Sequence, residues 1–129
     1  MSPRTETFYY FDFTKEQEKQ YLLTAETGST AEGAVSLYAD EQLTKKIGTL
    51  RYDYTILGNT KQVPVIDVEM TITTNEGSIK YKYIRDSYKK ITLDTEQTSG
   101  LFTKGTITRT YLEEDNIKRI RKLVYRSAE

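Results

Sequence analysis

The stretch KITLDTEQTSGLFTKGTITRTY, from Lys90 to Tyr111, contains two strand-like runs on either side of a loop with two glycines, Gly100 and Gly105. Apolar and β-branched residues alternate with polar ones in both runs, and this period of two is typical of strands. A glycine in the loop favours a turn with positive φ, whereas one that interrupts a strand indicates a bulge or a close approach of two backbones. We therefore predict two antiparallel strands here.

Further strands are predicted wherever the same alternation returns. The ranges are 7–14, 34–39, 49–57, 65–73, 78–85 and 117–126. The last run also fits helical spacing, but its β-branched content and the short acidic segment before it favour a strand. The two most regular runs each place apolar side chains on one face, and these eight are expected to be buried: Leu50, Tyr52, Tyr54, Ile56, Ile66, Val68, Met70 and Ile72.

Turn and loop residues separate these runs. Tight turns are predicted at 58–60 and 74–77, a loop at 27–33 (TGSTAEG), and polar connections at 15–19 and 40–46. The total is roughly eight short strands in meander order, which predicts an all-β, antiparallel, calycin-like barrel. A sandwich is the alternative, but closing the sheet into a barrel removes the unpaired strand edges that a sandwich retains.

The composition limits the chemistry. A chain of 129 residues is expected to form a single domain, residues 1–129. Cysteine and histidine are both absent, which excludes disulfides, thiolate nucleophiles, histidine-based triads and the usual zinc sites. Carboxylates, Tyr and Lys remain as reactive groups, and neither a metal nor a cofactor is predicted.

Charge and hydropathy limit the partners. The 19 basic and 19 acidic residues cancel, so no global attraction to nucleic acid or to a membrane surface is expected. Five positive charges lie between 118 and 126, but alternation splits them between two faces, so nucleic-acid binding is not predicted. No apolar run is long enough to cross a bilayer, and the N-terminal MSPRTETFYY lacks the apolar segment of a signal peptide. The sequence therefore predicts a cytoplasmic or intracellular protein, or else one whose export signal is not in this sequence.

Three segments resemble the barrel superfamily of allene oxide cyclases, dirigent proteins and bacterial spirotetronate-type cyclases. They are LYADEQLTKKIGTLRYDYTI (37–56), VIDVEMTITTNEGSIKYKYI (65–84) and LDTEQTSGLFTKGTITRTYL (93–112). The resemblance covers about 33–125 and implies a calyx whose lumen takes an apolar small molecule, together with an outer surface that forms dimers or trimers. The family loop commonly carries two glycines, a threonine and a glycine, whereas this chain has only Thr98-Ser99-Gly100 there, so no catalytic residue is carried over.

Five residues are the candidates for a ligand-binding lumen: Tyr52, Tyr54, Met70, Tyr81 and Tyr83. Each tyrosine offers an aromatic wall and one hydroxyl group, although such residues also serve as core or interface. Two functions fit the chain. One is a small-molecule-binding barrel that acts as a cofactor-independent cyclase, isomerase or dirigent-like protein by positioning its substrate. The alternative is a non-catalytic structural or assembly protein, such as a virion or complex component.

Two further groups of side chains carry hypotheses. Arg51, Asp53, Asp67 and Glu69 alternate with the predicted core positions, so they are expected on a solvated outer face with weak ion pairs; a catalytic role would require them in the lumen. The run TFYYFDFT (7–14) has aromatics on both faces, of which a barrel buries only one. The other face would form an exposed apolar patch, which predicts a homo-oligomer, unless an internal loop or helix covers it.

Overall fold

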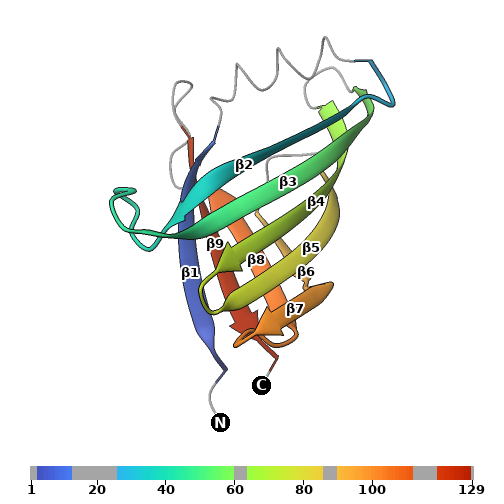
Figure 1. The fold of residues 1–129 in the computed structure, drawn as a ribbon. Helices are drawn as coiled ribbons and strands as arrows, with labels where there is room; N and C mark the ends of the chain where they lie inside the picture. The colour runs from blue at the N-terminus through green and yellow to red at the C-terminus, as the bar shows by residue number, and fades with distance from the viewer. Residues whose placement is uncertain (1–2, 13–25, 60–63, 86–89, 112–118, 129) are drawn as a thin grey trace.

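The structure is a computed structural model that describes residues 3–12, 26–59, 64–85, 90–111 and 119–128. These residues form nine antiparallel strands in one sheet and contain no helix, so none of them belongs to a helix that could span a membrane. The sheet curls strongly, and β2 to β5 cross over β1, β9 and β8 (Figure 1). The strands are β1 (Thr5–Asp12), β2 (Thr30–Tyr38), β3 (Lys46–Asn59), β4 (Pro64–Thr74), β5 (Gly77–Arg85), β6 (Ile91–Asp94), β7 (Gln97–Gly100), β8 (Gly105–Tyr111) and β9 (Arg119–Ser127).

One extended segment joins the two edges of this sheet. The strand order is β6-β8-β9-β1-β2-β3-β4-β5-β7, so β6 and β7 are opposite edges although only Thr95 and Glu96 separate them in the chain. The Thr95 N–H donates to the Gly105 carbonyl at the start of β8 (3.0 Å), and the Glu96 N–H donates to the Lys80 carbonyl of β5 (2.7 Å). The segment therefore changes partner between these two residues, and the curled sheet closes into the predicted barrel.

The glycine predictions for this region are confirmed. Gly100 has φ of 67°, in the left-handed region that favours glycine. At Gly105 an added Cβ would lie 2.1 Å from the Arg126 carbonyl oxygen, so the backbones of β8 and β9 approach too closely for any side chain. The predicted hairpin also forms, because β6 pairs with β8. The intervening segment is more ordered than a loop, since its β7 residues pair with β5.

The strand predictions hold for the described residues, with two corrections. The predicted loop at 27–33 is wrong from Thr30 onward, because β2 begins there and pairs along β3. Gly33 is a strand residue: an added Cβ would lie 2.5 Å from Tyr52 Oη, so its missing side chain makes room for the tyrosine ring. The turn predicted at 58–60 is also wrong at its first two residues, since Gly58 and Asn59 still belong to β3 after a register shift, and Thr60 lies outside the described residues. The connection at 15–19 lies outside the described residues.

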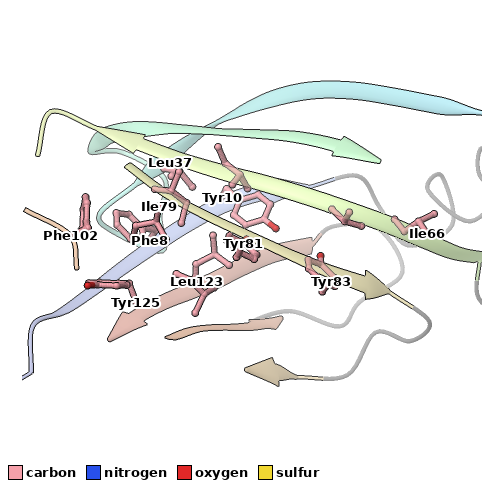
Figure 2. Close-up of a cluster of buried hydrophobic side chains, with 14 of the residues drawn as sticks. Phe8, Tyr10, Leu37, Ile66, Ile79, Tyr81, Tyr83, Phe102, Leu123 and Tyr125 are labelled. Carbon is pink, nitrogen blue, oxygen red and sulfur yellow. The ribbon is translucent and has the colours of Figure 1, made fainter. Parts of the chain in front are cut away.

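One end of the barrel is filled by apolar side chains. Phe102, from the loop before β8, packs edge-to-face on Tyr125 with ring centroids 5.3 Å apart, and the Arg4 guanidinium lies 5.2 Å from the centre of the Phe102 ring. The Tyr125 hydroxyl donates to the Thr103 carbonyl (2.5 Å), which holds this loop against β9. Phe102 and Tyr125 lie together at one end of the core, with Tyr83 and Ile66 toward the other (Figure 2).

The face assignment of β3 and β4 is confirmed by their register, but burial along that face is uneven. Five of the eight predicted residues are buried: Leu50, Ile56, Ile66, Val68 and Ile72. Tyr52, Tyr54 and Met70 are only half-buried, which corrects the prediction for these three. They face the same way as the buried residues, because Tyr52 pairs with Met70 and Tyr54 with Val68. Burial along β3 on this face is therefore complete at Leu50 and Ile56 and partial between them.

Substitutions at adjacent positions of β4 test which face is the core. Val68 is buried and Asp67 is exposed. Val68→Asp places an ionised carboxylate among apolar side chains, which costs several kcal/mol, whereas Asp67→Ala should change the free energy of unfolding by less than about 0.5 kcal/mol. Urea unfolding followed by far-ultraviolet circular dichroism measures both. Equal losses of stability in the two variants would contradict the assignment.

Candidate functional site

The inner face of the barrel becomes polar toward one end. On four strands the inward residues are apolar at one end of the barrel and charged at the other, and on β5 and β1 tyrosines lie between them. The antiparallel order of the strands brings the charged positions to the same end. The inward residues are Ile79, Tyr81, Tyr83 and Arg85 on β5, Ile107 and Arg109 on β8, Tyr125, Leu123 and Arg121 on β9, and Phe8, Tyr10 and Asp12 on β1. We call Tyr10, Asp12, Tyr81, Tyr83, Arg85, Arg109 and Arg121 the polar cluster.

Three arginines of this cluster are buried. The exposed fraction is 4% for Arg85, 2% for Arg109 and 1% for Arg121. Removing a guanidinium from water costs on the order of several kcal/mol before its partners compensate, so three of them inside one small barrel are expensive for stability. Clusters of this kind are typical of functional sites, where selection maintains groups that packing alone would replace.

Two of these arginines are fixed by contacts between strands. Arg121 Nε lies 2.5 Å from Asp12 Oδ2, an ion pair between the neighbouring strands β9 and β1. Arg109 Nη1 donates a hydrogen bond to the Tyr83 hydroxyl, and its guanidinium carbon lies 5.0 Å from the centre of that ring. The second contact joins β8 to β5, the two strands that flank the segment formed by β6 and β7, so it links strands that do not pair with each other. Arg109 is therefore held in one orientation.

Two tyrosines of the cluster, Tyr10 and Tyr81, are held in the neutral form. Burial raises the pKa of Tyr10 and the pKa of Tyr81 well above the usual 10.0, because an ionised phenolate would lose its hydration there. The positive charges of Arg121 and Arg109 oppose both shifts. The Tyr81 hydroxyl donates to Met70 Sδ (3.0 Å), a weak acceptor.

The five residues predicted to line a lumen form one continuous surface. Across β3, β4 and β5, Tyr52 lies opposite Met70, which lies opposite Tyr81. In the next row Tyr54 and Tyr83 flank a valine. The rings of Tyr52 and Tyr54 are stacked 6.1 Å apart, and those of Tyr81 and Tyr83 6.2 Å apart. We call these five residues the tyrosine wall; it meets the polar cluster at its two β5 tyrosines.

The tyrosine wall keeps accessible surface between two buried layers. Along β3, the half-buried Tyr52 and Tyr54 lie between Leu50 and Ile56, which are both buried. Along β4, Met70 lies between two buried residues in the same way. Burial on the inner face of β3 and β4 is therefore partial at Tyr52, Tyr54 and Met70, which makes these three residues the candidate contact surface for a ligand.

Sequence reasoning identified the tyrosine wall but missed the charged part of the cluster. Arg85 has the same parity as Tyr81 and Tyr83, and Arg109 the same parity as Ile107. Alternation alone thus placed both arginines on the core face. They were overlooked because an arginine in a strand is normally read as an outward residue, since arginine is rarely fully buried.

The four charges predicted on the outer face do lie there. Arg51 is 63% exposed at its side chain and contacts Glu32 (3.1 Å) and Asp53 (4.0 Å). Glu69 pairs with Lys80 (3.0 Å) and Lys82, and the nearer lysine lowers its pKa. Such pairs are solvated and contribute little to stability.

An open groove on this side of the sheet has a volume of about 590 Å³. Its lining residues, mostly from the outer face, are Thr30, Ala31, Glu32, Asp53, Tyr54, Thr55, Asp67, Glu69 and Lys82. Among the described residues no group of three Asp or Glu side chains is arranged to hold a metal ion. The groove is therefore not a metal centre of these residues.

Comparison with known proteins identifies solved structures that have a similar fold. No protein-family model matches the sequence, and no curated protein matches it. Among solved structures, a pyocyanin demethylase has a TM-score of 0.62 and 17% identity over 93% of this chain and 99% of its own. A pterocarpan synthase dirigent protein has a TM-score of 0.69 and 13% identity over 96% and 88%. An exo-specific intermolecular Diels-Alderase has a TM-score of 0.60 and 12% identity over 96% and 99%.

These likenesses extend over nearly the whole of this chain and of each solved structure, so they concern the complete barrel and not a shared hairpin. At these identities they establish the fold, and activity has to be argued from the site. The barrel fold that the resemblance implied is thereby confirmed: the chain has a β-barrel fold similar to that of the dirigent protein.

Proposed function

We propose that this protein is a small-molecule-binding barrel that holds a largely apolar substrate against the tyrosine wall. The observation that carries the proposal is the accessible inner surface at Tyr52, Tyr54 and Met70, which borders buried tyrosines and arginines. Stacked aromatic rings favour a flat or unsaturated ligand skeleton. Fixed hydroxyl and guanidinium donors at one end of the wall give such a ligand one preferred orientation.

The chemistry that suits this site is a cofactor-independent cyclisation or isomerisation. An enclosed surface that holds one reactive conformer supplies much of the barrier reduction by orientation alone. Neutral phenols and a guanidinium further stabilise negative charge that develops on a substrate oxygen. Both effects need only the residue types found here, so the lack of His and Cys is compatible with catalysis.

A second candidate is a non-catalytic structural or assembly protein that forms a homo-oligomer. Phe11, on the outer face of β1, is 45% exposed and pairs with Ile120 of β9, while Tyr9 beside it is half-buried. Phe8 and Tyr10 face inward, so the apolar patch comprises outer-face residues only. Phe13 lies outside the described residues.

The binding proposal is tested with a neutral aromatic probe, 2-naphthamide, whose intrinsic fluorescence reports transfer to an apolar site. We expect saturable one-to-one binding. Tyr54→Ala removes one ring of the wall and should raise the dissociation constant about fivefold, the equivalent of about 1 kcal/mol of aromatic contact.

Tyr38→Ala is the matched control, because Tyr38 is a half-buried tyrosine that pairs with Tyr9 on the outer face. It should leave the dissociation constant unchanged. Binding that does not saturate, or an equal loss in both variants, would remove the support for a ligand site on the inner face.

The neutral tyrosines predict a loss of stability at alkaline pH. The folded-state pKa values of Tyr10 and Tyr81 are raised above 10.0, so the unfolded chain releases these protons first. The free energy of unfolding should therefore fall as the pH rises above about 10, by up to about 1.4 kcal/mol per pH unit for each tyrosine. Urea titrations between about pH 8 and pH 11 measure the slope, which should be smaller in Tyr10→Phe and Tyr81→Phe. Identical slopes in wild type and both variants would show that other groups cause the loss.

The oligomer proposal predicts sedimentation as a multiple of 15.0 kDa at micromolar concentration. Phe11→Ser should then shift the population to the monomer, because it removes the most exposed aromatic of the patch. Leu101→Ser, which alters a 59% exposed residue elsewhere, should not. A wild-type protein that stays at 15.0 kDa on further concentration rules out the oligomer.

A further inference from the structure

One outward face of the barrel combines aromatic rings with positive charge. It comprises Tyr9 and Phe11 of β1 with Lys122 and Arg126 of β9, and we call it the basic aromatic face. Tyr9 lies opposite Lys122 in register, and Phe11 is 45% exposed. At the other outward positions of β1, β8 and β9, the described strands carry only uncharged residues. The positive charge of this face is therefore not neutralised on these three strands.

The outer groove on β2 to β5 has the opposite charge. Its lining includes Glu32, Asp53, Asp67 and Glu69 but only one basic residue, Lys82. Asp53 lies opposite Glu32 on one side and opposite Glu69 on the other, and like charges at directly opposed positions destabilise a sheet. Ion pairs engage Glu32 and Glu69, whereas Asp53 approaches a base only to 4.0 Å. Asp67 is exposed and forms no ion pair within the described part of the chain.

Exposed apolar side chains accompany the charges on both faces. Ile84, which is 62% exposed, lies opposite Asp67 of the groove. Leu57, which is 44% exposed, lies two residues beyond Thr55 of the groove on β3. With Phe11, three of the four large apolar side chains that are exposed among the described residues lie on or beside these two faces. Apolar area combined with charge of one sign suits a protein partner better than a small ion.

The two faces point away from each other. β2 to β5 cross over β1, β9 and β8 (Figure 1), and the inner sides of both layers contribute to one core, for example Val68 and Leu123. Their outer sides therefore lie on opposite sides of the barrel and cannot meet within one chain. A second copy can bring its basic aromatic face to the groove of the first, and its own groove then remains available to a third copy.

We propose that this chain associates head to tail with itself, the basic aromatic face of one copy docking in the acidic groove of the next. Phe11 then meets the exposed aliphatic side chains beside the groove, while Lys122 and Arg126 meet the carboxylates of Asp53 and Asp67. A symmetric contact between two basic aromatic faces would bring like charges together, so electrostatic complementarity favours the head-to-tail arrangement. This inference rests on the self-association proposed above as the second candidate function, because it names the surface to which the exposed aromatic face binds.

Sedimentation velocity of two variants and of their mixture tests the arrangement. Phe11→Ser alters the basic aromatic face and Asp67→Lys reverses a charge in the groove, so each variant alone should sediment at 15.0 kDa. Mixed in equal amounts, they should form a species of two chains. The Asp67→Lys chain keeps an intact basic aromatic face and the Phe11→Ser chain keeps an intact groove, and a head-to-tail contact needs only one of each.

Glu41→Lys is the matched control for the change of charge. Glu41 is exposed in the loop between β2 and β3, so the variant alters the net charge as Asp67→Lys does but lies outside both faces. It should sediment like the wild type. Far-ultraviolet circular dichroism checks that all three variants fold, which is expected because each altered side chain is exposed.

The dependence on salt gives a second readout. Raising the salt from about 0.1 M to about 1 M shortens the Debye length from about 10 Å to about 3 Å. The dissociation constant of the wild-type assembly should therefore rise at least about tenfold over this range. A contact formed by apolar side chains alone would show no such rise.

The outcomes distinguish the inference from the proposal on which it rests. If the wild type stays monomeric on concentration, self-association fails and the inference fails with it. If the wild type associates and Asp67→Lys associates equally well, the oligomer stands and the head-to-tail contact is overturned. A mixture of the two variants that remains at 15.0 kDa would also overturn the inference.

Discussion

The barrel depends on the change of partner between Thr95 and Glu96. A curled sheet of nine strands has two edges, and an edge with unpaired N–H and C=O groups invites association with other chains. Here the two edge strands, β6 and β7, are consecutive parts of one segment. This segment is hydrogen-bonded to β8 on one side and to β5 on the other, so neither edge is left open. The Thr95 side chain reinforces the junction, since its hydroxyl accepts from the Gly105 N–H (3.0 Å). Closure of the sheet encloses an interior, and the side chains that fill this interior determine the remaining features of the structure.

The inside is divided along the barrel axis. At one end the Phe102 loop covers an apolar core, which supplies the burial that stabilises a domain of this size. At the other end buried arginines and tyrosines replace aliphatic side chains. An apolar core would be the cheaper solution, because replacing a buried ion pair by well-packed hydrophobic residues is often neutral or stabilising. The polar end therefore lowers stability relative to an apolar core of the same size.

The same fold occurs in proteins with different activities. A pyocyanin demethylase, a dirigent protein and a Diels-Alderase have barrels similar to this one at 12% to 17% identity. Backbone hydrogen bonds define the barrel, whereas its chemistry depends on the side chains that line it. In this chain the inward side chains near one end include buried arginines and tyrosines.

The sequence by itself determined the strands, their faces and the barrel, because period-two alternation and glycine placement depend on the local backbone. It also identified the tyrosine wall, since Tyr52, Tyr54, Tyr81 and Tyr83 share the parity of core residues. It misread Thr30 to Gly33 as a loop, because a glycine that accommodates Tyr52 cannot be told from a turn glycine without its partner strand.

Only the tertiary structure decided which inward residues meet. The contact between Arg109 and Tyr83 joins residues 26 positions apart on strands that are not neighbours in the sheet. The strand order decides at which end of the barrel the arginines lie, and the sequence of a single strand does not specify that order. The partial exposure of Tyr54 and Met70 could not be predicted either. Alternation indicates which face a side chain lies on, but not how closely other side chains pack against it.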